Sequence, residues 1–185
     1  MTISIKYYFN KSIKLISTKK FNDSRGYFTE KYNKKNFKKN NINIDFVQEN
    51  FSSSKFKYTL RGLHFQNEPY SQIKLISVLK GKIFDVVVDL RKNSKFYKKY
   101  KSFILKESDN LQLLIPKGFA HGFCTLENNT QILYKTSNFY SKNYEITIAW
   151  NDPEINIKWP FNNIKPIQSN KDKNASNISM FERRF

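Results

Sequence analysis

Short apolar runs of about four to eight residues, bounded by turn-forming residues, dominate the sequence and constrain its fold most strongly. Successive runs are spaced by about ten residues, as in a β-sandwich or β-barrel. They cover residues 46–51, 58–65, 72–79, 83–90, 101–106, 111–115, 122–126, 131–136 and 145–149. We therefore predict a single all-β domain spanning residues 1–185, with an N-terminal arm and an irregular C-terminal tail.

A Gly-containing turn and two helix-favouring segments refine this prediction. Lys80-Gly81-Lys82 separates two apolar runs, and this pattern predicts a hairpin of two paired strands. A helix is favoured only around residues 33–39 and 175–184, so the helices should be short and peripheral.

The charge of the chain is strongly positive, with 33 Lys and Arg residues against 15 Asp and Glu residues. A net charge of +18 can indicate a nucleic-acid-binding protein. However, only five of the basic residues are Arg, whose planar fork suits phosphate clamps and base readout, and the Lys residues are scattered. We interpret most of the charge as solvated surface, while a few basic residues in a cleft would suffice to bind a small diphosphate.

Hydropathy and cysteine content narrow the class of protein further. No stretch approaches the roughly 20 apolar residues of a membrane span, and the first residues lack the apolar run of a signal peptide. The single cysteine, Cys124, excludes a disulfide framework and suits a reducing compartment. We expect a cytoplasmic protein.

His64 lies in the segment LRGLHFQ, which combines a predicted strand with several polar side chains. Strict alternation along that strand would place Arg61 and Leu63 on one face and Gly62, His64 and Gln66 on the other. A His in such a strand is either a buried structural group or part of a site, and the strand pattern leaves both open.

His121 ends the pattern Pro116-x-Gly118-x-x-His121 at the entrance of a predicted strand. This pattern is similar to the second motif of the cupin superfamily, whose fold is a double-sheet jelly roll. Many cupins bind a metal through three His and one Glu, which this chain cannot do, because His64 is its only other histidine. A site of two His and one carboxylate remains formally possible.

Seven segments in order carry a closer resemblance: DSRGYFTE, FVQENF, LRGLHFQ, QIKLISVLKGKIFDVVVDLRKNS, LLIPKGFAHGF, LYKTSNFY and AWNDPEINIKWP. Together they resemble the dTDP-4-dehydrorhamnose 3,5-epimerase family. The resemblance implies a cupin-type double-sheet jelly roll that uses neither metal nor other cofactor. It also implies a homodimer that converts dTDP-4-dehydro-6-deoxy-D-glucose to dTDP-4-dehydro-L-rhamnose in dTDP-L-rhamnose biosynthesis, by proton abstraction and reprotonation at C3 and C5.

The resemblance also implies the roles of individual residues. His64 would be the base, supported by Asp172, and Tyr134 the acid on the opposite face of the sugar. Lys74 would stabilise the developing oxyanion or contact the diphosphate. The implied substrate-binding residues fall into three groups. Arg25, Phe28 and Glu30 would come from the partner subunit's arm, and Gln48, Glu49 and Asn50 would lie near the nucleobase or ribose. Arg61 would bind the diphosphate, His121 would contact the sugar, Tyr140 would stack on the substrate, and Glu145 and Lys171 would lie beside it.

Three alternatives stay open at this point. One is an epimerase that acts on C3 or C5 only, or on a related nucleotide sugar. Another is a non-catalytic cupin that binds a saccharide, against which the presence of both His64 and Tyr134 argues. The third is a nucleic-acid-binding module, whose binding would be steeply sensitive to salt.

Overall fold

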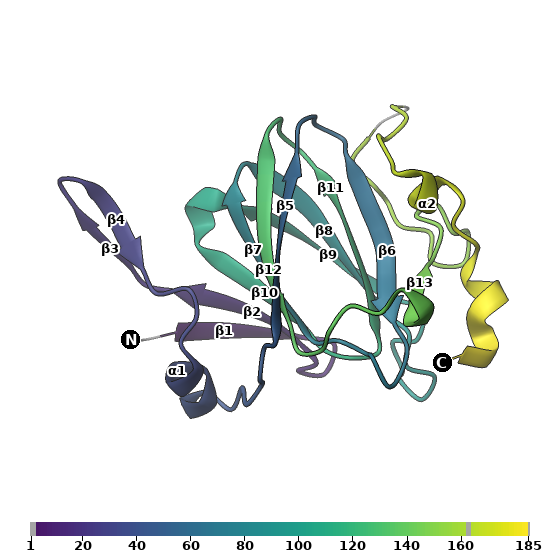
Figure 1. Ribbon diagram of the computed structural model, residues 1–185, viewed down its shortest axis with the longest axis horizontal. Helices are drawn as coiled ribbons and strands as arrows, with labels where there is room; N and C mark the ends of the chain where they lie inside the picture. Colours follow the sequence, from purple (N-terminus) through teal and green to yellow (C-terminus); the bar gives the residue numbers. More distant parts are fainter. Residues whose placement is uncertain (1–2, 162–163, 185) are drawn as a thin grey trace.

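Two antiparallel β-sheets form the body of the protein in the computed structural model, which describes residues 3–161 and 164–184 (Figure 1). The six-stranded sheet has the order β1-β2-β10-β7-β12-β5, and the five-stranded sheet has the order β13-β6-β11-β8-β9. The strands are β1 (Ile3–Tyr8), β2 (Ile13–Thr18), β3 (Lys20–Asp23), β4 (Gly26–Thr29), β5 (Gln48–Ser54), β6 (Leu60–Gln66), β7 (Lys74–Lys80), β8 (Lys82–Asp89), β9 (Tyr100–Lys106), β10 (Leu111–Ile115), β11 (Phe119–Thr125), β12 (Thr130–Thr136) and β13 (Glu145–Thr147). This arrangement confirms the predicted all-β, double-sheet fold.

The main core lies between the two sheets. Ile76 and Val78 of β7 face Ile83 and Val87 of β8, and Phe123 of β11 joins the same cluster. Alternate residues of each strand point inward, as the period of a strand requires. Each such side chain contributes about 1.5–3 kcal/mol when it is fully buried, so this cluster provides much of the driving force for closing the two sheets on each other.

Peripheral segments cover the outer faces of the sheets. The helix α1 (Lys34–Lys39) inserts Phe37 into an apolar cluster on the six-stranded sheet, and the side chain of Asn33 caps its first turn. On the five-stranded sheet, Ile155 and Ile178 of the C-terminal region pack against Val88 and neighbouring residues. The C-terminal region therefore belongs to the packed structure and is not a loose tail.

The C-terminal segment lies beside β6 and β13 (Figure 1). It contains the helical turn α2 (Asn170–Lys173) and the 3-10 helix η3 (Ile178–Arg184). Helical structure at residues 33–39 and in the last part of the chain was expected, whereas α2 was not. Two further 3-10 turns, η1 (Glu107–Asp109) and η2 (Lys142–Tyr144), connect strands.

The predicted hairpin at Lys80-Gly81-Lys82 is wrong. The strands on either side of Gly81, β7 and β8, belong to different sheets, so the chain crosses from one sheet to the other at this point. Gly81 has a φ of +78°, and a Cβ atom there would lie 2.6 Å from Oγ1 of Thr130. A glycine between two apolar runs suits a corner between sheets as well as a hairpin turn, and the local pattern cannot separate them.

The N-terminal region contains more strand than predicted. β1 and β2 form one end of the six-stranded sheet, and only the hairpin of β3 and β4 projects from the body as an arm (Figure 1). The ISIKYY sequence of β1 mixes apolar and polar residues at an exposed edge, which made its apolar pattern weak.

No helix in residues 3–161 and 164–184 has both the length and the apolar character that crossing a membrane requires.

Candidate active site

A cavity of about 870 Å³ opens between β5, β6, β7, β12 and the C-terminal segment. Its size is typical of a site for a small organic ligand. Eleven of the residues singled out in the sequence line it: Gln48, Asn50, Arg61, His64, Lys74, His121, Tyr134, Tyr140, Glu145, Lys171 and Asp172. The structure therefore gathers most of the predicted site in one place, from segments that are far apart in the chain.

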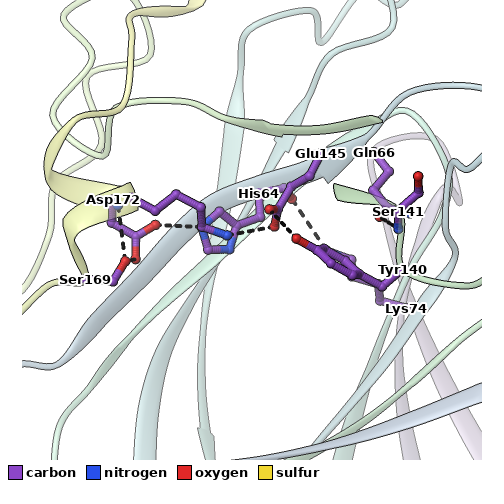
Figure 2. Close-up of polar contacts among 9 residues, drawn as sticks. His64, Gln66, Lys74, Tyr140, Ser141, Glu145, Ser169 and Asp172 are labelled. Atoms are coloured by element: carbon purple, nitrogen blue, oxygen red, sulfur yellow. Dashed lines mark hydrogen bonds and ion pairs between the residues drawn. The ribbon is translucent and has the colours of Figure 1, made fainter. Parts of the chain in front are cut away.

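His64 and Asp172 form a close pair at the C-terminal side of the cavity (Figure 2). Nε2 of His64 lies 2.6 Å from Oδ1 of Asp172, whose residue is only 4% exposed. Burial raises the pKa of Asp172, but the hydrogen bonds from His64 and Ser169 outweigh it and hold that pKa below its ordinary value. The carboxylate is thus ionised near neutral pH, and it favours the His64 tautomer with the proton on Nε2.

The pKa of His64 is lowered from its ordinary value because burial outweighs the opposing effect of Asp172. A neutral imidazole that donates through Nε2 keeps a lone pair on Nδ1. Such a group can accept a proton near neutral pH, and the carboxylate behind it would stabilise the imidazolium that results.

A bulge in β6 determines which of its side chains face the cavity. Opposite β11, Arg61 pairs with Phe123 and His64 pairs with His121, so β6 holds one extra residue between the paired positions. Arg61 and His64 therefore both line the cavity although they are three residues apart. Leu63 instead packs in the apolar cluster of Ile155 and Ile178 on the five-stranded sheet. The alternation expected from the sequence, with Arg61 and Leu63 on one face, is wrong for this reason.

Two glycines make this bulge possible. Gly62 has a φ of +114°, and a Cβ atom there would lie 2.7 Å from Cα of Gly122 and 2.7 Å from the carbonyl oxygen of His121. Only glycine fits so close an approach of two backbones.

Lys74 is a cation that lines the cavity. It begins β7, is half-buried, and its Nζ donates to the carbonyl oxygen of His64 at 3.5 Å. Desolvation lowers the pKa of Lys74 to about 8, although Glu145 and Asp85 oppose this change. Lys74 is therefore charged at neutral pH but held in an unfavourable environment, which an anion in the cavity would improve.

A chain of polar contacts joins residues that line the cavity (Figure 2). Glu145 accepts hydrogen bonds from Nζ of Lys171 at 2.8 Å and from the hydroxyl of Tyr140 at 3.0 Å. Burial raises the pKa of Glu145, but these partners outweigh it, so the carboxyl is ionised. Tyr140 is 53% exposed, so its ring can contact a ligand at the cavity mouth.

Tyr134 and His121 supply further polar groups. Within the described part of the chain the hydroxyl of Tyr134 has no hydrogen-bond partner, and burial raises its pKa, so the phenol keeps its proton at neutral pH. Nε2 of His121 contacts Oδ2 of Asp85 at 2.9 Å. Asp85 is fully buried, and its Oδ1 has no hydrogen-bond partner among the described residues.

Four of the predicted site residues lie away from this cavity. Arg25 is exposed at the tip of the arm and pairs with Asp23, Phe28 is 65% exposed on the arm, and Glu30 accepts hydrogen bonds from two Asn side chains near α1. Glu49 alternates with its cavity-lining neighbours on β5, so it faces outward and pairs with Lys135.

Two residues beside the site were not predicted from the sequence. Asp85 stands out as a carboxylate within the apolar run of β8, a pattern that indicates a buried, paired acid. Ser169 precedes Asp172 by three residues, a spacing typical of a helix N-cap.

No group of three or more His, Cys, Asp or Glu residues in the described ranges, 3–161 and 164–184, is arranged to hold a metal ion. The ionisable side chains that line the cavity are acids and bases. A histidine–carboxylate pair, a cation and a protonated phenol around one cavity can remove a proton next to a carbonyl group, stabilise the resulting enolate, and return a proton.

Comparisons with known proteins agree with this chemistry. The family model described as dTDP-4-dehydrorhamnose 3,5-epimerase matches residues 11–179. The dTDP-4-dehydrorhamnose 3,5-epimerase of Shigella flexneri is 46% identical over 161 residues, which cover 87% of this chain and 88% of that protein.

Solved structures give the same result. The dTDP-4-dehydrorhamnose 3,5-epimerase of Bacillus anthracis, solved with TDP and PPi bound, superposes with a TM-score of 0.91 at 43% identity, covering 95% of this chain and 99% of that one. The dTDP-6-deoxy-D-glucose-3,5-epimerase of Legionella pneumophila, in complex with dTDP-4-keto-L-rhamnose, has a TM-score of 0.92 at 36% identity, covering 98% and 96%.

Proposed function

The chain belongs to the dTDP-4-dehydrorhamnose 3,5-epimerase family and is thus an isomerase, and we propose that it epimerises both C3 and C5 of dTDP-4-dehydro-6-deoxy-D-glucose. The product would be dTDP-4-dehydro-L-rhamnose. The single observation that carries this proposal is the His64–Asp172 pair, which lines the same cavity as Lys74 and Tyr134.

His64 is the base in the proposed reaction. Its Nδ1 takes the proton from C3 or C5, which the neighbouring C4 ketone makes acidic, and the electron pair of the C–H bond moves into an enolate. Asp172 stabilises the imidazolium through Nε2. The ammonium of Lys74 stabilises the negative charge on O4, which grows during the step.

Tyr134 returns the proton on the opposite face of the sugar. Each inversion then leaves His64 protonated and Tyr134 as a phenolate, so both groups must exchange protons with solvent before the next inversion. This requirement gives the reaction a measurable signature, because a solvent-derived hydrogen ends at each inverted carbon. None of these steps calls for a metal or another cofactor.

The remaining cavity residues are assigned to binding. The guanidinium of Arg61 suits the diphosphate, as a fork that can bind two oxygens at once. His121 contacts the sugar, Glu145 and Lys171 lie beside the substrate, and the exposed ring of Tyr140 stacks on it. Gln48 and Asn50, which hydrogen-bond to each other at 2.8 Å, contact the nucleobase or ribose.

The projecting arm supports an active site shared between two subunits. Phe28 and Arg25 lie on this hairpin, exposed and outside the cavity of their own chain. In the proposed homodimer the arm reaches the partner's cavity, where these residues and Glu30 hold the nucleotide. Phe51 on the edge strand β5 is 59% exposed, and the dimer would cover it. Glu49 reaches substrate only if its outward position is part of that interface.

We assign the whole chain, residues 1–185, to one epimerase domain acting in the cytoplasm. The buried, unpaired thiol of Cys124 suits that reducing compartment.

The proposal is tested by incubating the protein with dTDP-4-dehydro-6-deoxy-D-glucose in deuterated water. We expect deuterium at both C3 and C5 of the product. Exchange at one carbon would identify a single-centre epimerase, and exchange at neither would leave a binding protein. The His64→Ala variant should abolish exchange at both carbons, and activity that a chelator removes would contradict the metal-free steps.

A further inference from the structure

Ser169 lies next to the catalytic pair and makes two hydrogen bonds to one residue. It is the N-cap of α2, and its Oγ accepts the backbone N–H of Asp172 at 3.2 Å. The same hydroxyl donates to Oδ2 of Asp172 at 2.8 Å. Its single proton and one of its lone pairs are thus both used on Asp172 (Figure 2).

The two oxygens of the Asp172 carboxylate therefore have different partners. Oδ1 meets Nε2 of His64 at 2.6 Å, and Oδ2 meets the hydroxyl of Ser169. A carboxylate held at both oxygens cannot rotate without breaking both contacts. We propose that Ser169 is a positioning residue of the proton abstraction, which holds the Asp172 carboxylate in the plane that orients His64.

The segment that carries Asp172 has little stability of its own. α2 contains only four residues, and a helix of that length is not stable in isolation. Its preceding residues are fixed by Ile167, which pairs in parallel with Thr59 and accepts the N–H of Leu60 at 2.8 Å. Between Ile167 and Asp172, Ser169 is the residue whose side chain hydrogen-bonds to the Asp172 carboxylate.

The hydroxyl also affects the charge of the pair. Its donation is one of the causes that lower the pKa of Asp172. Without it the carboxylate is free to turn away from Nε2 of His64, so the contact that stabilises the imidazolium weakens and the pKa of His64 falls. A residue that only supported the fold would leave this titration unchanged.

Three variants separate the donor from the helix cap. Ser169→Ala removes both, and Ser169→Thr keeps both. Ser169→Gly removes the hydroxyl, but glycine is tolerated at a helix N-cap almost as well as serine. The matched control is Ser176→Ala, the same deletion in the same segment, where the exposed side chain makes no hydrogen bond within the described residues.

The titration of His64 is measured by NMR and does not depend on activity. The chain has only two histidines, so its imidazole spectrum contains two sets of signals, and His64→Asn identifies which set belongs to His64. We expect the pKa of His64 to fall in Ser169→Ala and Ser169→Gly, and to stay at the wild-type value in Ser169→Thr and Ser176→Ala.

The kinetic test of Ser169 rests on the proposed function. Loss of a hydrogen bond to a charged group typically costs about 10- to 100-fold, so kcat should fall by that factor in Ser169→Ala and Ser169→Gly with little change in KM. Ser169→Thr should retain most of the activity.

A His64 pKa in Ser169→Gly that is unchanged or raised would overturn the inference, even if kcat fell. A wild-type kcat in that variant would overturn it as well. If wild-type protein itself showed no exchange at C3 or C5, the proposed function would fail, while the NMR result would still decide whether Ser169 controls His64.

Discussion

Replacing Lys74 by Met separates the catalytic need for an ammonium group from its cost to stability. Lys74 is half-buried in the cavity, and desolvation there lowers its pKa from 10.5 to about 8. At about 1.4 kcal/mol per pKa unit, holding the charged form in this place costs the folded protein roughly 3 kcal/mol at pH 7. A methionine of similar length removes the charge and keeps the apolar stem.

The sign of the pH dependence follows from the two pKa values. Between pH 8 and 10.5 the unfolded chain binds more protons at Lys74 than the folded chain does, so the free energy of unfolding rises with pH in that range. The cost is present in full below about pH 8 and disappears above 10.5. Relative to wild type, Lys74→Met should be more stable by up to about 3 kcal/mol at pH 7 and by about 2 kcal/mol at pH 9.

Activity should change in the opposite direction. Loss of one donor that stabilises a developing oxyanion costs about 2.7–4 kcal/mol, which is about 10²- to 10³-fold in kcat. In wild type, kcat/KM should fall above about pH 8 as Lys74 loses its proton. That decline should be absent in the residual activity of Lys74→Met.

Urea unfolding at one protein concentration and two pH values measures the stability, and exchange at C3 and C5 measures the activity. A Lys74→Met protein that is less stable than wild type at pH 7 would refute the reasoning, because the ammonium would then be well compensated in the folded state. A stability difference that does not shrink between pH 7 and 9 would refute it equally.

Three further changes probe the base, the acid and the bulge. Asp172→Asn should lower kcat by about 10³- to 10⁴-fold at nearly unchanged KM, since an amide no longer favours the Nε2–H tautomer of His64; a loss below 10-fold in steady-state assays would contradict this role. Tyr134→Phe should block inversion but still allow deuterium to enter C3 and C5 with retention of configuration, because His64 can return a proton to the face from which it took one. Loss of all deuterium exchange at these carbons, measured by NMR, would argue against a dedicated acid. Gly62→Ala should destabilise the fold by more than about 2 kcal/mol, because its Cβ would lie 2.7 Å from Cα of Gly122. Roughly 1 kcal/mol shifts the melting temperature of a domain of this size by 2–4 °C. A melting temperature within 2 °C of wild type would therefore show that the bulge relaxes to accept the Cβ atom.

For the residues of the arm, the sequence predicts a role but not the position at which they act. The resemblance assigned Arg25 and Phe28 to nucleotide binding, and the structure leaves both exposed on a hairpin outside the cavity of their own chain. In the proposed homodimer the binding partner of the arm is another subunit, so neither local pattern nor the fold of one chain can show where the arm binds.

The residue types and the strand pattern were predictable from the sequence alone. Alternating apolar residues at the spacing of strands require a buried face, and eleven predicted site residues do line one cavity. The scarcity of histidine was equally informative, because two histidines cannot form a three-His metal site. The role of His64 as the base came from the family resemblance.

Only the tertiary structure decided which of these residues meet. Asp172 reaches His64 from 108 positions away on a turn that no pattern predicted, and the bulge at Gly62 places Arg61 beside His64 on the cavity face. β7 and β8 diverge into separate sheets at Gly81, where the local sequence suits a hairpin equally well. Apolar periodicity is a local property, whereas register, bulges and the choice of sheet depend on pairing between distant segments. That pairing brings His64, Asp172 and Lys74 to the same cavity.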